Sequence, residues 1–557
     1  MSNPALPDTP ADLLVCGQPL MAGGSTPTDA QAWAQVFAGG APALAALSGG
    51  FAVGVLLGEG HAAMAADRMG LQTLYYRMDG GELRFAARAD TLVDSGQALD
   101  TQAVYDYFYF HAIASPRTVF AGVHRLPPGH WALWQHGQLT VQPFWTPRFS
   151  PARDPSFEAL RDEFRGVLVD AVRRAWQAEG GSPACFLSGG TDSSTVAGML
   201  REASGQAPET YSIGFEAEGY DEMAYARIAS KHFGTRHHEY YVTPQDLLEG
   251  IPLAAAAFDQ PFGNSSALPT WCCARLAKSD GINRLLAGDG GDELFGGNSR
   301  YAKQRIFGWY DHVPKPLRTG LMEPLLMHTP LGRLPLVRKA ASYVEQARVP
   351  MPDRLQTYNL LARLGHTEVL TAAFLDHVNQ GSPLAQQRQV WQACSATTAL
   401  DRNLAFDWRY TLAESDLPKV HMATSMAGVS VGYPLLDDKL LEFSMRLPTH
   451  YKLRGLKLRW FFKEALRGFL PDEIITKPKH GFGLPFGVWA IRHPKLSAFA
   501  AESVRGLAAR GVLRPEFVES LLRDRLPESP GYYGEMVWIA MMLEQWLRHH
   551  APNWRID

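Results

Sequence analysis

Cysteine is scarce in this chain of 557 residues, which contains five, an odd number that includes the adjacent pair Cys272 and Cys273. So few cysteines do not make a disulfide framework, and without a Cys-x-x-Cys spacing they indicate no zinc site. Apolar runs of about eighteen residues are also missing, and the first residues lack a basic start followed by an apolar core. We therefore expect no membrane span, no secretory signal, and a place in the reducing cytoplasm.

An excess of charge of either sign is missing too. There are 53 Lys and Arg against 56 Asp and Glu, for a net charge of −3. A nucleic-acid-binding surface needs a basic patch, so we expect no nucleic-acid partner. What the chain does have is apolar residues, 46% of the total, and a length that suits about two to four domains with large cores.

Proline marks one boundary along the chain. Residues 143–155 hold four prolines, which exclude a helix there and predict a linker. Before it, strand-like runs at residues 83–87 and 131–134 predict a β-rich domain over residues 1–147. After it, residues 156–178 show helical periodicity, and strands then alternate with helices to about residue 300. This alternation predicts an α/β domain with a parallel sheet over residues 155–557, with a helical C-terminal part.

The most informative segment is Ser-Gly-Gly-Thr-Asp-Ser-Ser at residues 188–194, which follows an apolar run at residues 184–187. The pattern predicts a buried strand, a glycine-rich turn and a helix that begins near Ser193. Such a turn binds anions, because backbone N–H groups and the helix dipole favour negative charge. Asp192 would repel an anion unless a divalent cation lay between them. We therefore expect a nucleotide pyrophosphate with Mg²⁺, held by Ser188, Gly189, Gly190, Asp192, Ser193 and Ser194.

A second glycine-rich segment, at residues 285–297, carries three acidic side chains within five residues, Asp289, Asp292 and Glu293. Carboxylates crowded in this way repel one another unless a cation is present. Asp192 and Asp292 are therefore the predicted Mg²⁺ ligands. The lysine of the Gly-x-x-x-x-Gly-Lys-Ser/Thr loop is missing from both segments, which excludes the nucleotide loop of kinases and GTPases.

Further segments follow in an order that resembles one family. They are residues 211–215, 220–227, 259–270, 432–437 and 479–485. With the two loops, they resemble the synthetase domain of the asparagine synthetases, although Gly432 and Leu435 depart from the family's R-x-P-F-L-D element. The resemblance implies an ATP pyrophosphatase fold, which splits ATP into AMP and pyrophosphate. It also places Leu187, Ile213, Gly214, Phe215 and Gly288 around the nucleotide.

The N-terminal domain resembles the glutaminase domain of that family only in part. Residues 50–55 and 67–76 keep its later pattern, but the segments that hold glutamine are missing. The family's nucleophile is a cysteine exposed after loss of Met1, and here Ser2 follows Met1. Cys16 would imitate such a start only after processing. We expect a degenerate, shortened domain of the Ntn-type glutaminase-like fold that produces no ammonia.

For the reaction, the resemblance implies that a carboxylate is adenylated and that an amine then displaces AMP. Lys479, in a segment that resembles the family's K-x-G-F-x-x-P element, is expected to neutralise the α-phosphate or the oxyanion. Asp289 stands where asparagine synthetases carry Glu and β-lactam synthetases carry Tyr. Its carboxylate is able to position or deprotonate an amine. Asp289 and Lys479 are the predicted catalytic residues, and ATP and Mg²⁺ the predicted cofactors.

The motifs do not identify the amine that attacks the activated carboxylate. An intact synthetase half beside an inactive glutaminase half resembles the lasso-peptide cyclases, which join a side-chain carboxylate of a leader-free precursor peptide to its own N-terminal amine. The partners then implied are the precursor peptide, a leader peptidase and a leader-recognition protein. The alternatives are an ammonia-dependent asparagine synthetase, another small-molecule amide ligase, a cyclase similar to β-lactam synthetases, and a non-catalytic scaffold. The acidic groups in the glycine-rich loops disfavour the scaffold.

Overall fold

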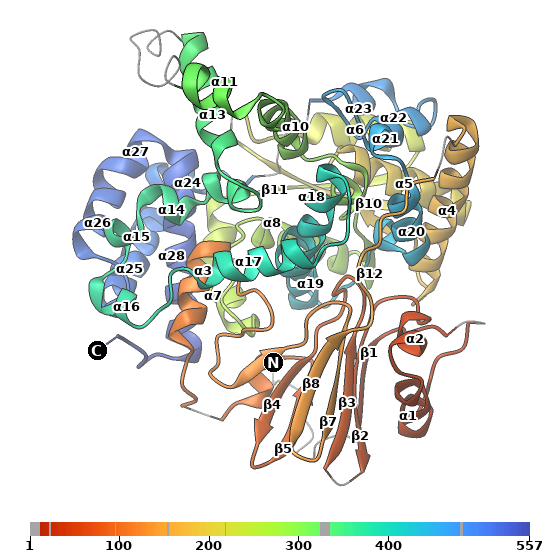
Figure 1. Cartoon of the computed structure of the whole chain (residues 1–557), viewed down its shortest axis with the longest axis horizontal. Coiled ribbons are helices and arrows are strands. Elements are labelled where there is room, and N and C mark those ends of the chain that lie inside the picture. Colours follow the sequence, from red (N-terminus) through yellow and green to blue (C-terminus); the bar gives the residue numbers. More distant parts are fainter. Residues whose placement is uncertain are drawn as a thin grey trace.

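The computed structural model describes residues 12–21, 24–58, 60–94, 96–152, 155–217, 219–323, 335–478 and 483–556. Figure 1 shows two regions along the chain: antiparallel strands from the N-terminal part gather at one end, and helices around a parallel sheet form the rest. The α/β class and the β-rich start predicted from the sequence are confirmed.

The N-terminal region is built from two antiparallel sheets. Five strands in the order β1-β2-β3-β7-β8 form the larger sheet, and three in the order β5-β4-β6 form the smaller one. Their bounds are Leu13–Gly17 (β1), Phe51–Gly58 (β2), His61–Ala66 (β3), Tyr75–Asp79 (β4), Glu82–Ala86 (β5), Val123–Arg125 (β6), His130–Gln135 (β7) and Gln138–Pro143 (β8). Strands β5 and β7 are those predicted at residues 83–87 and 131–134.

Alternation along β2 buries both faces of the larger sheet. Ala52 belongs to an apolar cluster with Tyr76 and Leu83 of the smaller sheet, so the two sheets pack face to face. Val53 faces the other side, where it packs with Trp33. Trp33 lies on helix α1 (Ala30–Ala38), which is followed by α2 (Gly40–Ala45). The layers are therefore helix, sheet and sheet.

The second region is organised by a parallel sheet in the order β11-β10-β9-β12-β13. The strands are Ala184–Phe186 (β9), Glu209–Phe215 (β10), Arg236–Val242 (β11), Arg284–Leu286 (β12) and Ser430–Gly432 (β13). The chain starts at β9, runs outward to β11, and returns to β12 on the other side of β9. Such a reversal leaves a crevice at the carboxyl ends of β9 and β12, where open α/β sheets bind ligands.

Strand β13 was not predicted, because the regular alternation of strands and helices ends near residue 300. A segment from residues 430–432 adds this fifth strand beside β12, with Leu286 opposite Gly432. Nothing local distinguishes three residues as a strand. The neighbouring strand decides their conformation.

Helix α4 (Phe157–Gln177) shows how the predicted helices form. It begins after Ser156, whose Oγ accepts a hydrogen bond from the Ala159 N–H at 3.1 Å, and it buries Leu160 against the sheet. Near its other end, Arg174 donates to both carboxylate oxygens of Asp437, at 2.9 and 3.1 Å. Asp437 of the R-x-P-F-L-D-like segment therefore fastens α4 rather than lining the site.

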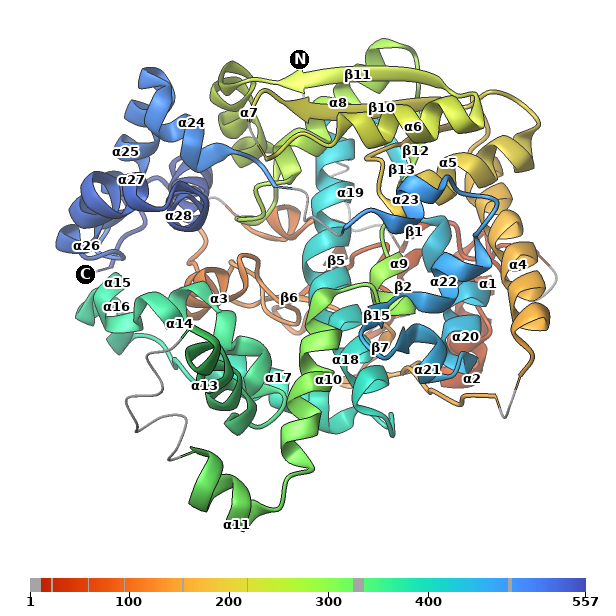
Figure 2. The ribbon, with the colours of Figure 1, turned by 90° about the horizontal axis from the view of Figure 1, so that it is seen from above.

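The other helices of this region are α5 (Thr191–Ser204), α6 (Met223–Phe233), α7 (Pro244–Ala257), α8 (Ala267–Ser279), α9 (Gly291–Phe295), α10 (Ser299–Asp311), α11 (Lys315–Leu317), α13 (Pro335–Arg348), α14 (Leu360–Leu364), α15 (His366–Val369), α16 (Ala372–Asp376), α17 (Ser382–Ala393), α18 (Ala399–Asp407), α19 (Leu417–Met426), α20 (Asp438–Arg446), α21 (Thr449–Lys452), α22 (Trp460–Ala465), α23 (Asp472–Thr476), α24 (Phe486–Arg492), α25 (Pro494–Ala509), α26 (Pro515–Ser520), α27 (Leu526–Glu528) and α28 (Pro530–His550). A π-helical stretch, η5 (Trp408–Asp416), leads into α19. Seen from above, α19 crosses the middle of the molecule and α24–α28 form a group at one side (Figure 2).

Among the described helices, none is both long and apolar enough to cross a bilayer.

Buried polar contacts join the two regions. Glu414 of η5 accepts hydrogen bonds from the N–H and Oγ of Ser115, at 3.1 and 2.8 Å, and pairs with Arg125 and Arg409. Helix α3 (Thr101–Phe110) packs into the core of the C-terminal helices, where the Tyr107 hydroxyl donates to the Ile539 carbonyl at 2.8 Å. These contacts bring the end of α3 to the cavity described next.

Candidate active site

A cavity of about 840 Å³ lies where the parallel sheet predicts a ligand. Its walls come from the loops after β9 and β12, from the start of α8, and from α19, α24 and α28. The end of α3 closes another side, so the N-terminal region contributes to the same cavity. Its volume lies at the upper end of the range of about 300 to 1,000 Å³ found for small-molecule sites. It therefore suits a nucleotide together with part of a second substrate.

The first loop joins β9 to α5, as predicted from the two glycines. Gly189 has φ +68°, and a Cβ there would overlap the backbone of Tyr225 and Ala226, so only glycine fits. The Ser193 hydroxyl lies 3.0 Å from Ser188 Oγ and accepts the Ser188 N–H at 3.1 Å. Helix α5 begins at Thr191, two residues earlier than expected. The loop and the N-terminus of a four-turn helix therefore present N–H groups and hydroxyls to an anion.

The second loop packs directly against the first. A Cβ on Gly288 would come within 2.9 Å of the Ser193 N–H, which requires glycine at this contact. Gly290 has φ +102° and lies against Leu436. Because the two loops touch, Asp192 and Asp292 converge although a hundred residues separate them in the chain.

The converging carboxylates share a cation that the sequence did not predict. Arg459 Nη1 donates to Asp192 Oδ2 at 2.9 Å and to Asp292 Oδ1 at 2.8 Å, and its Nη2 pairs with Asp192 Oδ1. The Arg459 side chain is 7% exposed. No local pattern marks this arginine, which is 267 residues from Asp192.

This arrangement tests whether the residues fit Mg²⁺. Two carboxylates that already share one cationic group are arranged as a pair of oxygen ligands, and Mg²⁺ in proteins usually takes one or two carboxylates plus substrate phosphates. Among the described residues there is no group of three or more His, Cys, Asp or Glu side chains placed to hold a metal. The pair therefore fits a cation that arrives with phosphate oxygens.

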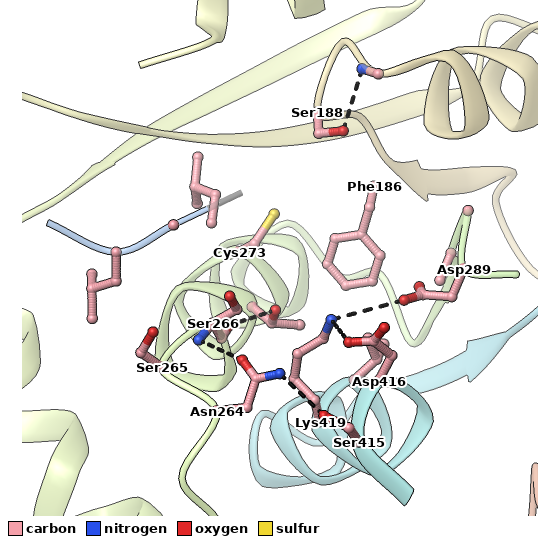
Figure 3. Close-up of a pocket in the computed structure, with 18 of the residues that line it drawn as sticks. Phe186, Ser188, Asn264, Ser265, Ser266, Cys273, Asp289, Ser415, Asp416 and Lys419 are labelled. Atoms are coloured by element: carbon pink, nitrogen blue, oxygen red, sulfur yellow. Dashed lines mark hydrogen bonds and ion pairs between the residues drawn. The ribbon is translucent and has the colours of Figure 1, made fainter. Parts of the chain in front are cut away.

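Asp289, predicted as catalytic, lies in the cavity wall beside two residues that were not predicted. Lys419 Nζ is 3.9 Å from Asp289 Oδ1 and 3.0 Å from Asp416 Oδ1 (Figure 3). Burial raises the pKa of Asp289 to about 6, although the Lys419 ammonium acts in the opposite direction. Burial lowers the pKa of Lys419, but the carboxylates of Asp416 and Asp289 outweigh it and raise that pKa overall. A carboxylate with a pKa near neutrality suits proton transfer.

Glu293 is the third acidic side chain of the second loop and also lines the cavity. Its pKa rises to about 8, mainly because it is buried and further because Asp416 and Asp407 are near. Near neutral pH it is therefore largely protonated, so it adds little negative charge beside the metal pair. The acidic cluster is less repulsive than its sequence suggested.

Neutral polar groups line the cavity beside Lys419 and Asp416. Asn264 Nδ2 donates to Ser415 Oγ at 3.4 Å, and Asn264 Oδ1 accepts the Ser266 N–H at 3.0 Å (Figure 3). Farther along, His111 Nδ1 lies 3.3 Å from Glu535 Oε1, and this contact lowers the pKa of Glu535. These donors and acceptors suit a polar substrate.

The structure brings most of the predicted site residues to one cavity. Those that line it are Leu187, Ser188, Gly190, Asp192, Ser193, Ile213, Gly288, Asp289 and Asp292. Those that do not line it are Gly189, Ser194, Gly214 and Phe215. Ser194 is fully buried and its hydroxyl has no partner among the described residues, so it does not present that hydroxyl to the cavity. Gly189 packs against Tyr225 and Ala226, and Gly214 packs against Asp221 and Tyr241.

Lys479, the other predicted catalytic residue, lies outside the described residues. The described chain on either side, Lys477 and Gly483, borders the site: Lys477 Nζ pairs with Glu222 at 3.1 Å and Gly483 lines the cavity. The role of Lys479 stays a prediction.

The N-terminal region does not present Cys16 as a nucleophile. Cys16 lies half-buried on β1 and packs against the apolar cluster between the two sheets, and this burial raises the pKa of its thiol. A nucleophilic cysteine needs a lowered pKa and access to its substrate. Beside it, the Phe85 ring occupies the space that a side chain on Gly54 would need. Apolar side chains therefore pack in the interior between the two sheets.

The chain is similar to known proteins along most of its length. Residues 163–548 match the asparagine synthase family, and residues 25–145, which begin after Cys16, match the glutamine amidotransferase domain family. The chain is 22% identical over 493 residues to glutamine-hydrolysing asparagine synthetase 1 of Bacillus subtilis (strain 168), covering 88% of this chain and 75% of that protein.

Two other relatives extend the comparison. A putative glutamine-hydrolysing asparagine synthetase 2 of Methanocaldococcus jannaschii is 31% identical over 261 residues, which is 45% of this chain and 50% of that protein. Amidase chyE of Penicillium rubens is 22% identical over 468 residues, which is 76% of this chain and 68% of that protein.

Proposed function

The chain belongs to the asparagine synthetase family, and on that premise we propose that it activates a carboxylate with ATP and joins it to an amine carried by the same substrate. The coarser statement, an ATP-dependent amide ligase that releases AMP and pyrophosphate, follows from the family. The finer statement rests on one observation. In the N-terminal region that would supply ammonia from glutamine, Cys16 is half-buried on strand β1 and packs against a cluster of apolar side chains.

In the first step, the substrate carboxylate attacks the α-phosphorus and pyrophosphate leaves. The N–H groups at the start of α5 and the hydroxyls of Ser188 and Ser193 stabilise the charge that develops on pyrophosphate. Asp192 and Asp292 would hold Mg²⁺, which supplies Lewis-acid stabilisation of phosphate oxygens.

In the second step, the amine attacks the acyl carbon, the C–N bond forms, and AMP leaves with the former carboxylate oxygen. The amine must lose a proton, and Asp289, with a pKa near 6, is the group in the cavity suited to accept it. Lys419 keeps Asp289 ionised at neutral pH and fixes its position between α19 and the second loop.

For the substrate, we favour a leader-free precursor peptide whose N-terminal amine closes a macrolactam on an internal side-chain carboxylate, as in lasso-peptide cyclases. A tethered amine gains effective concentration over free ammonia, which suits a chain without a working glutaminase. The polar wall at Asn264 and Ser415 and the pair His111–Glu535 offer hydrogen bonds to a peptide backbone. A precursor peptide, a leader peptidase and a leader-recognition protein are the partners that this proposal requires.

The second candidate is an ammonia-dependent asparagine synthetase or small-molecule amide ligase. Several relatives are named asparagine synthetase or putative asparagine synthetase, which favours asparagine as the product. Those names describe glutamine-hydrolysing proteins, so ammonia as the nitrogen source rests on the N-terminal region of this chain. The cavity of about 840 Å³ holds aspartate beside ATP as readily as one end of a peptide.

A substrate comparison separates the two. The enzyme is incubated with ATP and Mg²⁺, either with a leader-free peptide encoded beside its gene or with aspartate and ammonium, and products are weighed. We expect the peptide to lose one water and pyrophosphate to be released in equal amount. Asparagine formation from aspartate and ammonium, with no change of mass in the peptide, would establish the second candidate instead.

A further inference from the structure

The guanidinium of Arg459 lies where the proposed function needs Mg²⁺. It contacts three of the four oxygens of Asp192 and Asp292: both oxygens of Asp192 and Oδ1 of Asp292. A metal ion bound by this pair needs some of the same oxygens. Arg459 and Mg²⁺ therefore compete for one position.

The position is built for the arginine. A Cβ on Gly291 would overlap Asp192 Oδ1, and one on Gly297 would overlap Asp292 Oδ1 and the Arg459 side chain. Arg459 itself has φ +53°, a left-handed conformation that is costly for a residue with a side chain, and its N–H donates to the Gly296 carbonyl at 3.1 Å. The second loop therefore anchors the backbone of Arg459 as well as its side chain.

The charge balance favours exchange over permanent pairing. Arg459 brings one positive charge to the two carboxylates, whereas Mg²⁺ brings two, so the metal ion is attracted more strongly at the same oxygens. Arg459 Nε is buried and has no partner within the described part of the chain, so its fork retains an unused donor. A guanidinium displaced from carboxylates binds phosphate oxygens with the same forked geometry.

We infer that Arg459 is a positioning residue that occupies Asp192 and Asp292 until Mg²⁺ arrives with ATP, and that the displaced guanidinium then pairs with the phosphates. This inference rests on the proposed metal pair. It predicts that the nucleotide-free enzyme binds divalent cations weakly, because the cation must displace an arginine without a phosphate to receive it. Metal uptake is thereby coupled to nucleotide.

The test is Mn²⁺ binding to the full-length, nucleotide-free protein, followed by electron paramagnetic resonance of free Mn²⁺. For Arg459→Gln we expect Mn²⁺ affinity to rise by about ten-fold or more, since a unit charge at hydrogen-bond distance from the ligands has been removed. The matched control is Arg467→Gln, which removes the same charge from a side chain that pairs with Glu464 and Asp472 instead. In this control the Mn²⁺ affinity should change by less than about three-fold. Equal Mn²⁺ affinity in Arg459→Gln and the parent enzyme would overturn the inference.

A second arm uses α,β-methylene ATP, which is not cleaved at the bond in question. The parent enzyme should bind Mn²⁺ much more tightly with this analogue than without it, and Arg459→Gln should lose most of that difference. If Mn²⁺ binds with the analogue but the substitution changes neither state, only the role of Arg459 is wrong. If Mn²⁺ fails to bind even with the analogue, the metal pair of the proposed function is wrong as well. Should Arg459→Gln fold poorly, Arg459→Lys, whose single ammonium cannot span both carboxylates, should raise the nucleotide-free affinity in the same direction.

Discussion

Replacing Lys419 by methionine should move the acid limb of the pH–rate profile for amide formation to higher pH. Asp289 accepts the amine proton only when ionised, so the rate rises with pH through its pKa, near 6 in the parent enzyme. The Lys419 ammonium favours the ionised form. Without it, burial and the neighbouring Asp416 and Asp192 are unopposed, and the pKa of Asp289 rises further.

The size of the shift follows from the distance. At 3.9 Å, and at the effective dielectric constant of about 20 that suits such sites, the attraction between Lys419 and Asp289 is about 4 kcal/mol, which corresponds to about 3 pH units. Water at the cavity wall reduces this value, and opposite charges at such distances commonly shift a carboxyl by about 1 to 3 units. We therefore expect the limb to move from near pH 6 to roughly pH 7 to 9.

The assay separates the two half-reactions. Exchange of labelled pyrophosphate into ATP reports adenylation, and single-turnover amide formation reports the second step. In Lys419→Met the limb should move in amide formation while exchange keeps its pH profile. Asp289→Asn should remove this limb from the pH–rate profile. The remaining pH dependence should be that of the substrate amine, which also contributes to the profile of the parent enzyme. An unchanged limb in Lys419→Met would refute the assignment of Asp289 as the base held ionised by Lys419.

Other substitutions test the remaining parts of the site and fold. Asp192→Asn and Asp292→Asn should each lower Mg²⁺-dependent turnover by about ten-fold or more, measured by pyrophosphate release, and activity that survives in both would exclude them as metal ligands. Cys16→Ala should leave synthesis unchanged and glutamine intact; glutamate production that this substitution abolishes would show that the N-terminal region is a working glutaminase. Glu414→Ala should lower the free energy of unfolding by about 3 to 5 kcal/mol, because Arg125 is left buried without its partner. Urea denaturation measures this loss, and a loss below about 1 kcal/mol would mean that the pair adds little.

Local patterns predicted the parts of the site that are local in the chain. Two glycines and the start of a helix define the loop at Ser188, and the apolar run before the loop forms β9. Both features depend on residues that are close together in the sequence. The order of the motifs then predicted that Asp192 and Asp292 would meet. The bounds of the helix after Ser156 were predicted almost to the residue, because its N-cap serine and its periodic apolar residues are both local sequence features.

What the sequence could not indicate depends on contacts across the fold. Arg459 reaches Asp192 only after α22 packs beside the second loop, and a single arginine before three aromatic residues carries no pattern of its own. Lys419 had one weak signal, an aspartate three residues earlier on the same helical face, but salt-bridged surface pairs look the same in sequence. Phe110 and His111 enter the cavity because α3 of the N-terminal region packs on α28, which no motif records.

The central claim is that a substrate carboxylate is adenylated before the amide forms, and an oxygen label tests it most directly. The acceptor side-chain carboxylate of a leader-free peptide is labelled with ¹⁸O, and in parallel the β-carboxylate of aspartate is labelled and supplied with ammonium. After reaction with ATP, the phosphorus products are separated and weighed. The account predicts that AMP carries one ¹⁸O per amide formed and that pyrophosphate carries none. Label in inorganic phosphate with ADP as the coproduct, or amide formed with no label in AMP, would contradict it.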